Sequence, residues 1–479
     1  MTELPQIIQG GMGVAVSDWR LARSVSRLGQ LGVVSGTALA VVLSRRLQGG
    51  DPGGHMRRAL GHLPVPAVAR RVLADHFVAG GRPAGSPYRT PAMPSLKPSR
   101  ALEELTVAAN FVEVFLAKQG HGGLVGINLL EKIQMPTAAS LYGAMLAGVD
   151  YVLMGAGIPR AIPGALDRLA EGEPVELRID TDDATGGEAA VSRFDPRAFG
   201  DGVAARLRRP RFLAIVASST LASALVRKAT GRIDGFVVEG ASAGGHNAPP
   251  RGPLQLDDAG QPVYGERDLP DLAAIHALGL PFWLAGSYGV PGGVAAAREL
   301  GATGVQAGTV FAMCEESGLA TAFKRRILEL SRAGQALVRT DPLASPTGFP
   351  FKVVQVEGTL ADTSVYEARP RKCDLGYLRR AFRRGDGSVG YRCPAEPVAD
   401  YVRKGGAAAD TVGRKCVCNG LLAAIGLGRG RSDEADEPAL LTAGVRVADI
   451  ARFARAGCAS YTAAEVIEKL LGPQPAVAG

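Results

Sequence analysis

The sequence contains few cysteines, few aromatic residues and no long apolar run. Six cysteines in 479 residues do not form a disulfide framework, which indicates reduced thiols or metal ligands. No stretch reaches the roughly 18 apolar residues that a membrane span needs. The first residues, MTELPQIIQGGM, lack the basic and then apolar pattern of a signal peptide. We therefore expect a cytoplasmic protein without a membrane segment.

The charged residues also lack a strong pattern. The formal net charge of +8 comes mainly from scattered arginines, and no lysine-rich block with interleaved aromatic residues, as in nucleic-acid grooves, is present. A solvated basic surface is favoured, and a preference for an acidic substrate or carrier is the alternative. With 46% apolar and 21% charged residues the chain is globular, and its length predicts one large domain with an appendage.

Eight short apolar runs, rich in β-branched residues, are predicted strands, and most of them end in Gly, Ser or Asn. Continuous hydrophobicity is typical of strands that are buried on both faces, and the helical patterns between the runs indicate right-handed βα units. Eight such units predict an α/β fold of the (β/α)8 TIM barrel type, with its active site at the carboxyl ends of the strands. The runs are residues 6–12, 31–37, 124–130, 151–157, 212–219, 235–240, 282–287 and 304–311.

The connections between these runs carry helix signals and two long insertions. Ser99 is a predicted N-cap, as is Ser218 or Ser219. Residues 45–98 contain a predicted helix at 66–77, and within residues 160–210 the segments PVELRIDTDD and AAVSRFDP alternate like a hairpin. Insertions at the catalytic rim act as lids or pack over the barrel without a role in closure, and both interpretations remain open.

Beyond residue 340 the alternation of strands and helices stops. We therefore predict a barrel domain over residues 1–340 and a C-terminal extension over residues 341–479 that wraps on the barrel. The extension begins with an extended segment, SPTGFPFKVVQVEG, contains most of the cysteines and ends in two short helices, VADIARFARAG and TAAEVIEKLLG.

The last two runs of the barrel both end in small residues with free backbone N–H groups, the usual phosphate-gripping arrangement of barrels. Across the barrel, QGGM and SGT bring the backbone close to a ligand, as a flat ring requires, and an asparagine at the end of the third run can hydrogen-bond the edge of that ring. A phosphate site beside a glycine-lined slot points to FMN, with a sugar-phosphate substrate as the alternative. The predicted phosphate residues are Gly286, Ser287, Gly289, Gly308 and Thr309. The other predicted cofactor residues are Gly10, Gly11, Met12, Ser35, Gly36, Thr37, Asn128, Glu239, Gly244, Gly245 and Gln306.

One histidine stands out, in EGASAGGHNAPPRGP after the sixth run. Two glycines let the turn before His246 approach a ligand closely, and an imidazole can donate a hydrogen bond and move a proton near neutral pH. A structural histidine in a tight turn is the alternative. We predict that His246 is the catalytic residue.

Several motifs resemble the nitronate monooxygenase family, also called 2-nitropropane dioxygenases. They are PQIIQGGMG with SRLGQLGVVSGT, VVEGASAGGH, LAGSYG and GATGVQAGTVFAMCEES. The same motifs occur in FMN-dependent enoyl-ACP reductases, including trans-acting reductases of polyunsaturated fatty acid and polyketide pathways. The resemblance covers about residues 5–330 and implies an FMN barrel in which His246 faces the flavin. The chain departs from the family's simplest members by its long C-terminal extension and by NAPPRGP after the histidine.

Three functions follow from this resemblance. The first is FMN-dependent oxidation of a nitronate with O2. The alternative is transfer of hydride from NAD(P)H through FMN to an enoyl thioester on CoA or acyl carrier protein. The third is an FMN-binding scaffold within a biosynthetic complex. Association into a homodimer remains open.

The cysteines of the extension and one lysine are further candidates. Cys373, Cys393, Cys416 and Cys418 could supply four thiolates for zinc or an iron–sulfur cluster, but their spacing lacks the paired CxxC knuckles, so buried thiols are favoured. Lys132 follows Asn128 closely and could reach a flavin or an acidic substrate, although an exposed lysine is the favoured interpretation.

Overall fold

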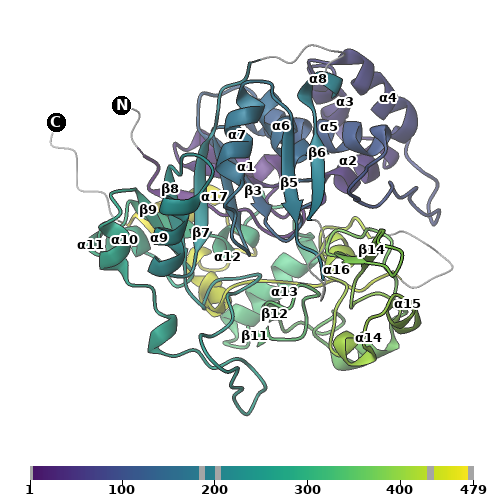
Figure 1. Ribbon diagram of the computed structural model, residues 1–479. Helices are drawn as coiled ribbons and strands as arrows, with labels where there is room; N and C mark the ends of the chain where they lie inside the picture. Colours follow the sequence, from purple (N-terminus) through teal and green to yellow (C-terminus); the bar gives the residue numbers. More distant parts are fainter. Residues whose placement is uncertain (1–3, 183–188, 200–205, 429–435, 473–479) are drawn as a thin grey trace.

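A closed barrel of eight parallel strands forms the centre of the protein (Figure 1). The computed structural model describes residues 4–182, 189–199, 206–428 and 436–472. Around the barrel the strands follow the order β1-β10-β9-β8-β7-β4-β3-β2. The strands are β1 (Ile7–Gln9), β2 (Leu31–Ser35), β3 (Val125–Leu130), β4 (Tyr151–Gly155), β7 (Arg211–Val216), β8 (Gly235–Glu239), β9 (Phe282–Ala285) and β10 (Gly304–Ala307). All eight coincide with predicted strands, so the (β/α)8 prediction is confirmed.

The barrel strands are buried on both faces, which explains their continuous hydrophobicity. One set of side chains fills the barrel interior, and Trp283 is its largest member, with an indole N–H that donates a 2.8 Å hydrogen bond to the Pro5 carbonyl. The alternate side chains, such as Ile7, Val34 and Phe236, pack against the helices outside. The interior set comprises Ile8, Leu31, Val33, Tyr151, Leu153, Leu213, Val237, Trp283 and Ala285. Because side chains fill the interior, a ligand has room only at the ends of the strands.

Helices cover the outside of the barrel. The predicted N-caps are confirmed, because the Ser99 hydroxyl accepts from the Leu102 N–H at 3.2 Å and the Ser218 hydroxyl accepts from the Leu221 N–H at 3.1 Å. The helices are α1 (Trp19–Arg27), α2 (Leu39–Gln48), α5 (Arg100–Lys118), α6 (Thr137–Leu146), α7 (Ile162–Ala170), α9 (Ser219–Lys228), α10 (Leu272–His276), α11 (Gly293–Glu299), α12 (Thr309–Ala312) and α13 (Thr321–Arg332). A 3-10 turn, η2 (Glu266–Asp268), lies in the loop after β8.

The two predicted insertions have regular structure. The first contains η1 (Pro52–Gly54), α3 (His55–Leu60) and α4 (Pro66–His76), which matches the helix predicted at 66–77. The second contains the antiparallel pair β5 (Val175–Ile179) and β6 (Ala190–Phe194), as predicted, followed by α8 (Pro196–Phe199). Residues 183–188 and 200–205 of this insertion lie outside the described residues. The β5 residues alternate between buried and exposed because one face of the hairpin packs on the barrel helices.

The C-terminal extension begins with two strands, β11 (Val338–Asp341) and β12 (Phe351–Val354), which pair antiparallel. The predicted boundary at 340 falls inside β11, and the division into domains stays a prediction. The further elements of the C-terminal extension are α14 (Thr363–Ala368), β13 (Arg380–Arg383), β14 (Val389–Arg392), α15 (Val398–Arg403), η3 (Ala408–Thr411), α16 (Val417–Ala424), η4 (Val445–Phe453) and α17 (Ala463–Leu471).

The extension returns to the barrel at its end. The first of the two predicted terminal helices is the 3-10 helix η4, where the Ser331 hydroxyl bonds the Ala448 carbonyl and the Ala451 N–H. The second is α17, which packs on α1, α11 and α12 and begins with a capping box between Thr462 and Glu465. Figure 1 shows α14–α16 on one side of the barrel and α17 among the barrel helices.

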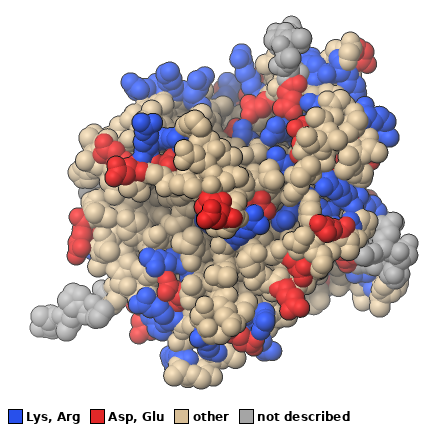
Figure 2. All heavy atoms as spheres, turned by 90° about the horizontal axis from the view of Figure 1, so that it is seen from below, with Lys and Arg blue, Asp and Glu red and all other residues tan. Residues whose placement is uncertain are grey.

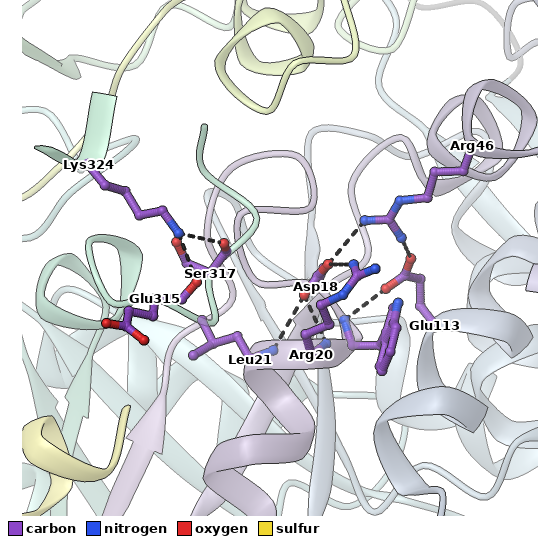
Figure 3. A network of polar contacts seen from close by, with 9 residues as sticks. Asp18, Arg20, Leu21, Arg46, Glu113, Glu315, Ser317 and Lys324 are labelled. Carbon is purple, nitrogen blue, oxygen red and sulfur yellow. Dashed lines mark hydrogen bonds and ion pairs between the residues drawn. The ribbon is translucent and has the colours of Figure 1, made fainter. Parts of the chain in front are cut away.

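A buried ion network fixes the segment that leads from β1 into α1 (Figure 3). Asp18 caps α1 and accepts from the guanidinium of Arg46 on α2 at 3.2 Å. Arg46 also pairs with Glu113 on α5, whose second oxygen accepts from the Trp19 N–H at 3.0 Å. Nearby, the Lys324 ammonium donates to three carbonyl oxygens of residues 314–317. The ion network and the hydrogen bonds of Lys324 hold loops at the same end of the barrel.

The surface carries both signs of charge. On the face shown in Figure 2, acidic side chains are interspersed with the basic ones. Among the residues that the structure describes, no helix is both long enough and apolar enough to cross a membrane.

Candidate functional site

Two adjoining cavities open at the carboxyl ends of the barrel strands. The first has a volume of about 960 Å³ and the second about 790 Å³, counting space that is open to solvent. They form one cleft, because seven residues line both. These shared residues are Gly11, Gly13, Glu239, Gly244, Gly245, Gln306 and Thr442.

The structure brings nearly all of the predicted site residues to this cleft. The exceptions are Gly36, which lines a smaller neighbouring cavity, and Ser287, whose hydroxyl donates to the Ser242 hydroxyl at 2.9 Å. The first cavity is lined by Gly11, Ser35, Thr37, Asn128, Glu239, Gly244, Gly245, His246 and Gln306. The second is lined by Gly10, Gly11, Met12, Glu239, Gly244, Gly245, Gly286, Gly289, Gln306, Gly308 and Thr309. The predicted phosphate loops thus lie in the second cavity and His246 in the first.

Close packing requires glycine at several of these positions, including Gly11 and Gly286. A Cβ on Gly11 would lie 2.3 Å from the Asn128 Cβ. Gly286 has a φ of +96°, and a Cβ there would lie 2.6 Å from the Ser242 hydroxyl. Side chains at these positions would displace the loops that form the cleft.

Two amides in the cleft each have a buried oxygen without a hydrogen-bond partner. They are Oδ1 of Asn128, on β3, and Oε1 of Gln306, on β10. A buried acceptor without a partner is costly, so these oxygens indicate a ligand that brings N–H or O–H donors. This donor requirement fits the ring N–H and the sugar hydroxyls of a flavin nucleotide.

His246 lies in the first cavity between the barrel and the C-terminal extension. Its Nε2 is 2.7 Å from the Ser345 hydroxyl, and its ring meets Phe351 edge to face at a centroid distance of 4.8 Å. Burial lowers the pKa of His246 to about 4, so the ring is neutral near pH 7. A neutral imidazole can serve as a hydrogen-bonding group, and this ring does not titrate near neutral pH.

A partly buried acid that lines the cleft, Glu239, interacts electrostatically with a buried amine, Lys352. Burial raises the pKa of Glu239 to about 8, and the charge of Lys352 acts in the opposite direction. Burial lowers the pKa of Lys352 to about 8, and its ammonium donates a 2.6 Å hydrogen bond to the Thr340 hydroxyl. Glu239 is protonated near pH 7, so this carboxyl adds little negative charge to the cleft.

The C-terminal extension supplies part of both cavity walls, which the sequence did not reveal. Thr442 lines both cavities, and its hydroxyl accepts from the Gly245 N–H at 3.0 Å. The extension also contributes Phe351, Tyr377, Leu378, Val417, Cys418 and Leu421 to the first cavity and Ala443, Gly444 and Arg446 to the second. No local motif marks these residues, because only the folded chain brings them to the barrel.

All six cysteines are free. The Cys373 and Cys393 thiols hydrogen-bond each other, which lowers the pKa of Cys373 and raises that of Cys393. Burial raises the pKa of Cys416, and it raises that of Cys418, on the wall of the first cavity, to about 12. Over the described part of the chain, no group of three or more His, Cys, Asp or Glu residues is arranged to hold a metal ion.

Lys132 does not line the cleft. Its ammonium lies 3.1 Å from Asp180 and 3.4 Å from Glu131. Lys132 lines a separate cavity, different from the one at Gly36, and Leu378 lines both this cavity and the first.

Comparison with known proteins confirms the resemblance that the motifs predict. Residues 169–341 match the family described as nitronate monooxygenase. The protein named "Probable nitronate monooxygenase" of Bacillus subtilis (strain 168) is 38% identical over 120 residues, which cover 25% of this chain and 33% of that protein. The nitronate monooxygenase of Pseudomonas aeruginosa is 33% identical over 143 residues, covering 29% and 38%. The chain thus matches only 33% and 38% of the lengths of these two relatives.

Among solved structures, the enoyl reductase domain of MlnA from the macrolactin biosynthesis cluster of Bacillus amyloliquefaciens resembles this chain over 98% of its length and 94% of the domain. The identity is 11% and the TM-score is 0.47. This likeness is too distant to indicate the reaction.

Proposed function

We propose that the protein is an FMN-dependent oxidoreductase that oxidises a nitronate with O2. The observation that carries the proposal is the composition of one cleft. Partnerless amide oxygens of Asn128 and Gln306 lie in the same cavity as the neutral ring of His246. The matched family segment, residues 169–341, contains Glu239, His246 and the phosphate loops, which supports the assignment.

The residues of the cleft fit FMN. The glycine loops at Gly286, Gly289 and Gly308 would hold the phosphate end, and Gly11 leaves room for the flat ring beside Asn128. The oxygens of Asn128 and Gln306 would accept hydrogen bonds from the cofactor. When bound, FMN supplies an acceptor for the electrons of a carbanionic substrate and passes them to O2.

The chain's own residues bind and orient the substrate. His246 presents a neutral ring to the anionic oxygens of a nitronate, and the Ser345 hydroxyl, 2.7 Å from Nε2, holds the ring in place. Glu239 stays protonated near pH 7 and does not repel the anion. The apolar residues Phe351 and Leu421 exclude water from the first cavity, which strengthens the hydrogen bond from His246.

Anaerobic mixing of the purified protein with a nitronate, NADH and NADPH in separate cuvettes tests this function. Bleaching of the flavin band by the nitronate alone, with colour restored by air, is the expected result. Fast bleaching by a nicotinamide would favour the second function described below. A protein that carries no flavin and takes none up would overturn the proposal.

The apolar lining of the first cavity favours a second candidate, reduction of an enoyl thioester with NAD(P)H as the donor. Eight Val, Leu or Ile side chains line this cavity, so a large part of its wall is apolar. An acyl chain carried by CoA or acyl carrier protein would bury against them. These residues are Val14, Leu129, Leu130, Ile133, Ile215, Leu378, Val417 and Leu421.

A further inference from the structure

The cleft contains a single cationic side chain. Of the described residues that line the two cavities, Arg446 alone is a lysine or arginine. It lines the second cavity together with Gly286, Gly289 and Gly308. A lone cation at one end of a cleft marks that end for the anionic part of a ligand.

Backbone contacts hold the segment that carries Arg446 between two loops of the barrel. The Gly444 N–H donates to the Thr309 hydroxyl at 2.8 Å, and the Val445 N–H donates to the Ser242 carbonyl at 3.1 Å. A Cβ on Gly444 would lie 2.8 Å from that same carbonyl oxygen, so the segment packs tightly on the loop. The backbone that carries Arg446 is therefore held in a fixed position.

The guanidinium of Arg446 retains unused donors. Its Nη1 pairs with Asp449 at 3.2 Å, while its Nε is buried without a partner. The side chain remains 43% exposed, so the charge is not deeply desolvated. An arginine held on one side by a carboxylate can still give its remaining N–H groups to a phosphate.

We infer that Arg446 binds the terminal phosphate of the flavin nucleotide and makes the site prefer FMN over riboflavin. This inference rests on the proposed FMN dependence. It assigns the cofactor's phosphate to the second cavity and its ring to the cavity of His246. Cofactor binding would then depend on η4 of the C-terminal extension, which lies outside the matched family segment.

Flavin titration of the full chain, freed of cofactor, tests the inference through binding alone. We would measure dissociation constants for FMN and riboflavin by flavin fluorescence in wild type, Arg446→Met and Arg446→Lys. The Met variant should bind FMN about 10–100-fold more weakly, as expected for loss of a hydrogen bond to a charged group, and riboflavin equally well. The Lys variant should recover part of the lost affinity. The matched control is Arg452→Met, an exposed arginine on the same 3-10 helix, and it should change neither constant.

A second variant tests the inference if Arg446→Met does not fold. Asp449→Asn removes the carboxylate that holds Nη1, so FMN should bind more tightly while riboflavin binding stays the same. FMN affinity that is unchanged in both Arg446→Met and Asp449→Asn would overturn the inference and leave the proposed function intact. A wild-type chain that binds neither flavin would overturn both.

Discussion

The backbone N–H of Gly245 donates a 3.0 Å hydrogen bond to the Thr442 hydroxyl, which joins residues 197 positions apart. On the other side of the same glycine, its carbonyl accepts from the Lys352 N–H at 2.9 Å. The glycine before His246 is thus held from both sides by the C-terminal extension. The extension is therefore part of the site's geometry as well as of its wall.

Replacement of Thr442 by valine should loosen this loop. The variant keeps the side-chain shape but leaves the Gly245 N–H without its acceptor, a loss of about 1–3 kcal/mol in the free energy of unfolding. We also expect a lower kcat/KM for the substrate that bleaches the flavin. Urea unfolding and steady-state kinetics measure both effects. Thr442→Ser retains the hydroxyl and should behave like wild type; equal losses in the two variants would contradict the role of this hydrogen bond.

Replacement of His246 by alanine should lower kcat/KM on the order of 10²-fold, as for loss of one oriented hydrogen-bond donor. The flavin content should not change, because the predicted cofactor contacts lie on other residues. Because the ring is neutral near pH 7, the wild-type pH profile should lack a limb near the usual histidine pKa. Full turnover in the alanine variant would remove His246 from the site.

The partly buried ring of His246 also makes stability depend on pH. Its pKa falls from 6.5 in the unfolded chain to about 4 in the folded protein, so below pH 6.5 the unfolded state binds the additional proton. Stability is therefore lost as the pH falls from about 6.5 to 4, by up to about 3 kcal/mol. Unfolding free energies of flavin-free wild type and His246→Gln, measured across this range, should differ in slope. Parallel curves would show that the ring titrates normally in the folded protein.

The sequence predicted the barrel well because burial on both faces leaves a local record. Each of the eight strands is a continuous apolar run, and the hairpin β5–β6 alternates because one face is exposed. Strand ends were less accurate: residues 6–12 were predicted, but β1 covers Ile7–Gln9, because the glycines that follow leave the sheet. The sequence also singled out the glycine loops and His246, which line the cleft, because tight turns require particular residues in a short stretch.

The residues that the C-terminal extension contributes to the site cannot be recognised from any local sequence pattern. Ser345, Thr442 and Arg446 are ordinary polar residues in irregular segments, and only the fold brings them to the cleft. Lys352 is the exception, because a lysine inside the apolar run FPFKVVQV is unusual and the structure shows it 2% exposed. A lysine inside an apolar extended segment could therefore have been singled out from the sequence.

The close contact at Gly11 gives a steric prediction. The methyl group of Gly11→Ala would meet Asn128 at 2.3 Å and displace either the loop after β1 or the amide. We expect a large loss of FMN affinity, measured by flavin fluorescence, with little change in the barrel's circular dichroism. Gly240→Ala is the matched control, because no atom lies within 4 Å of the added Cβ and its φ is not positive. Unaltered FMN binding in Gly11→Ala would place the ring away from Asn128.

The ion network beneath the β1 loop offers a test of stability that does not depend on any ligand. Burial alone would lower the pKa of Arg46, but the charges of Glu113 and Asp18 raise it, so the guanidinium remains charged. Arg46→Met would leave two carboxyl groups buried without their cation, at a cost of about 3–5 kcal/mol in the free energy of unfolding. Burial already raises the pKa of Glu113, and loss of Arg46 would raise it further.

A carboxyl whose pKa is raised in the folded state makes the fold less stable as the pH increases, because the unfolded state loses its proton first. The Arg46→Met variant should therefore lose more stability at pH 8 than at pH 5. Urea unfolding at both pH values measures the difference. The matched control is Arg20→Met, because Arg20 contacts the same Asp18 at 3.0 Å but is 51% exposed, and such pairs contribute less than about 1 kcal/mol. If both variants lost the same stability, the network would act through its packing and not through buried charge.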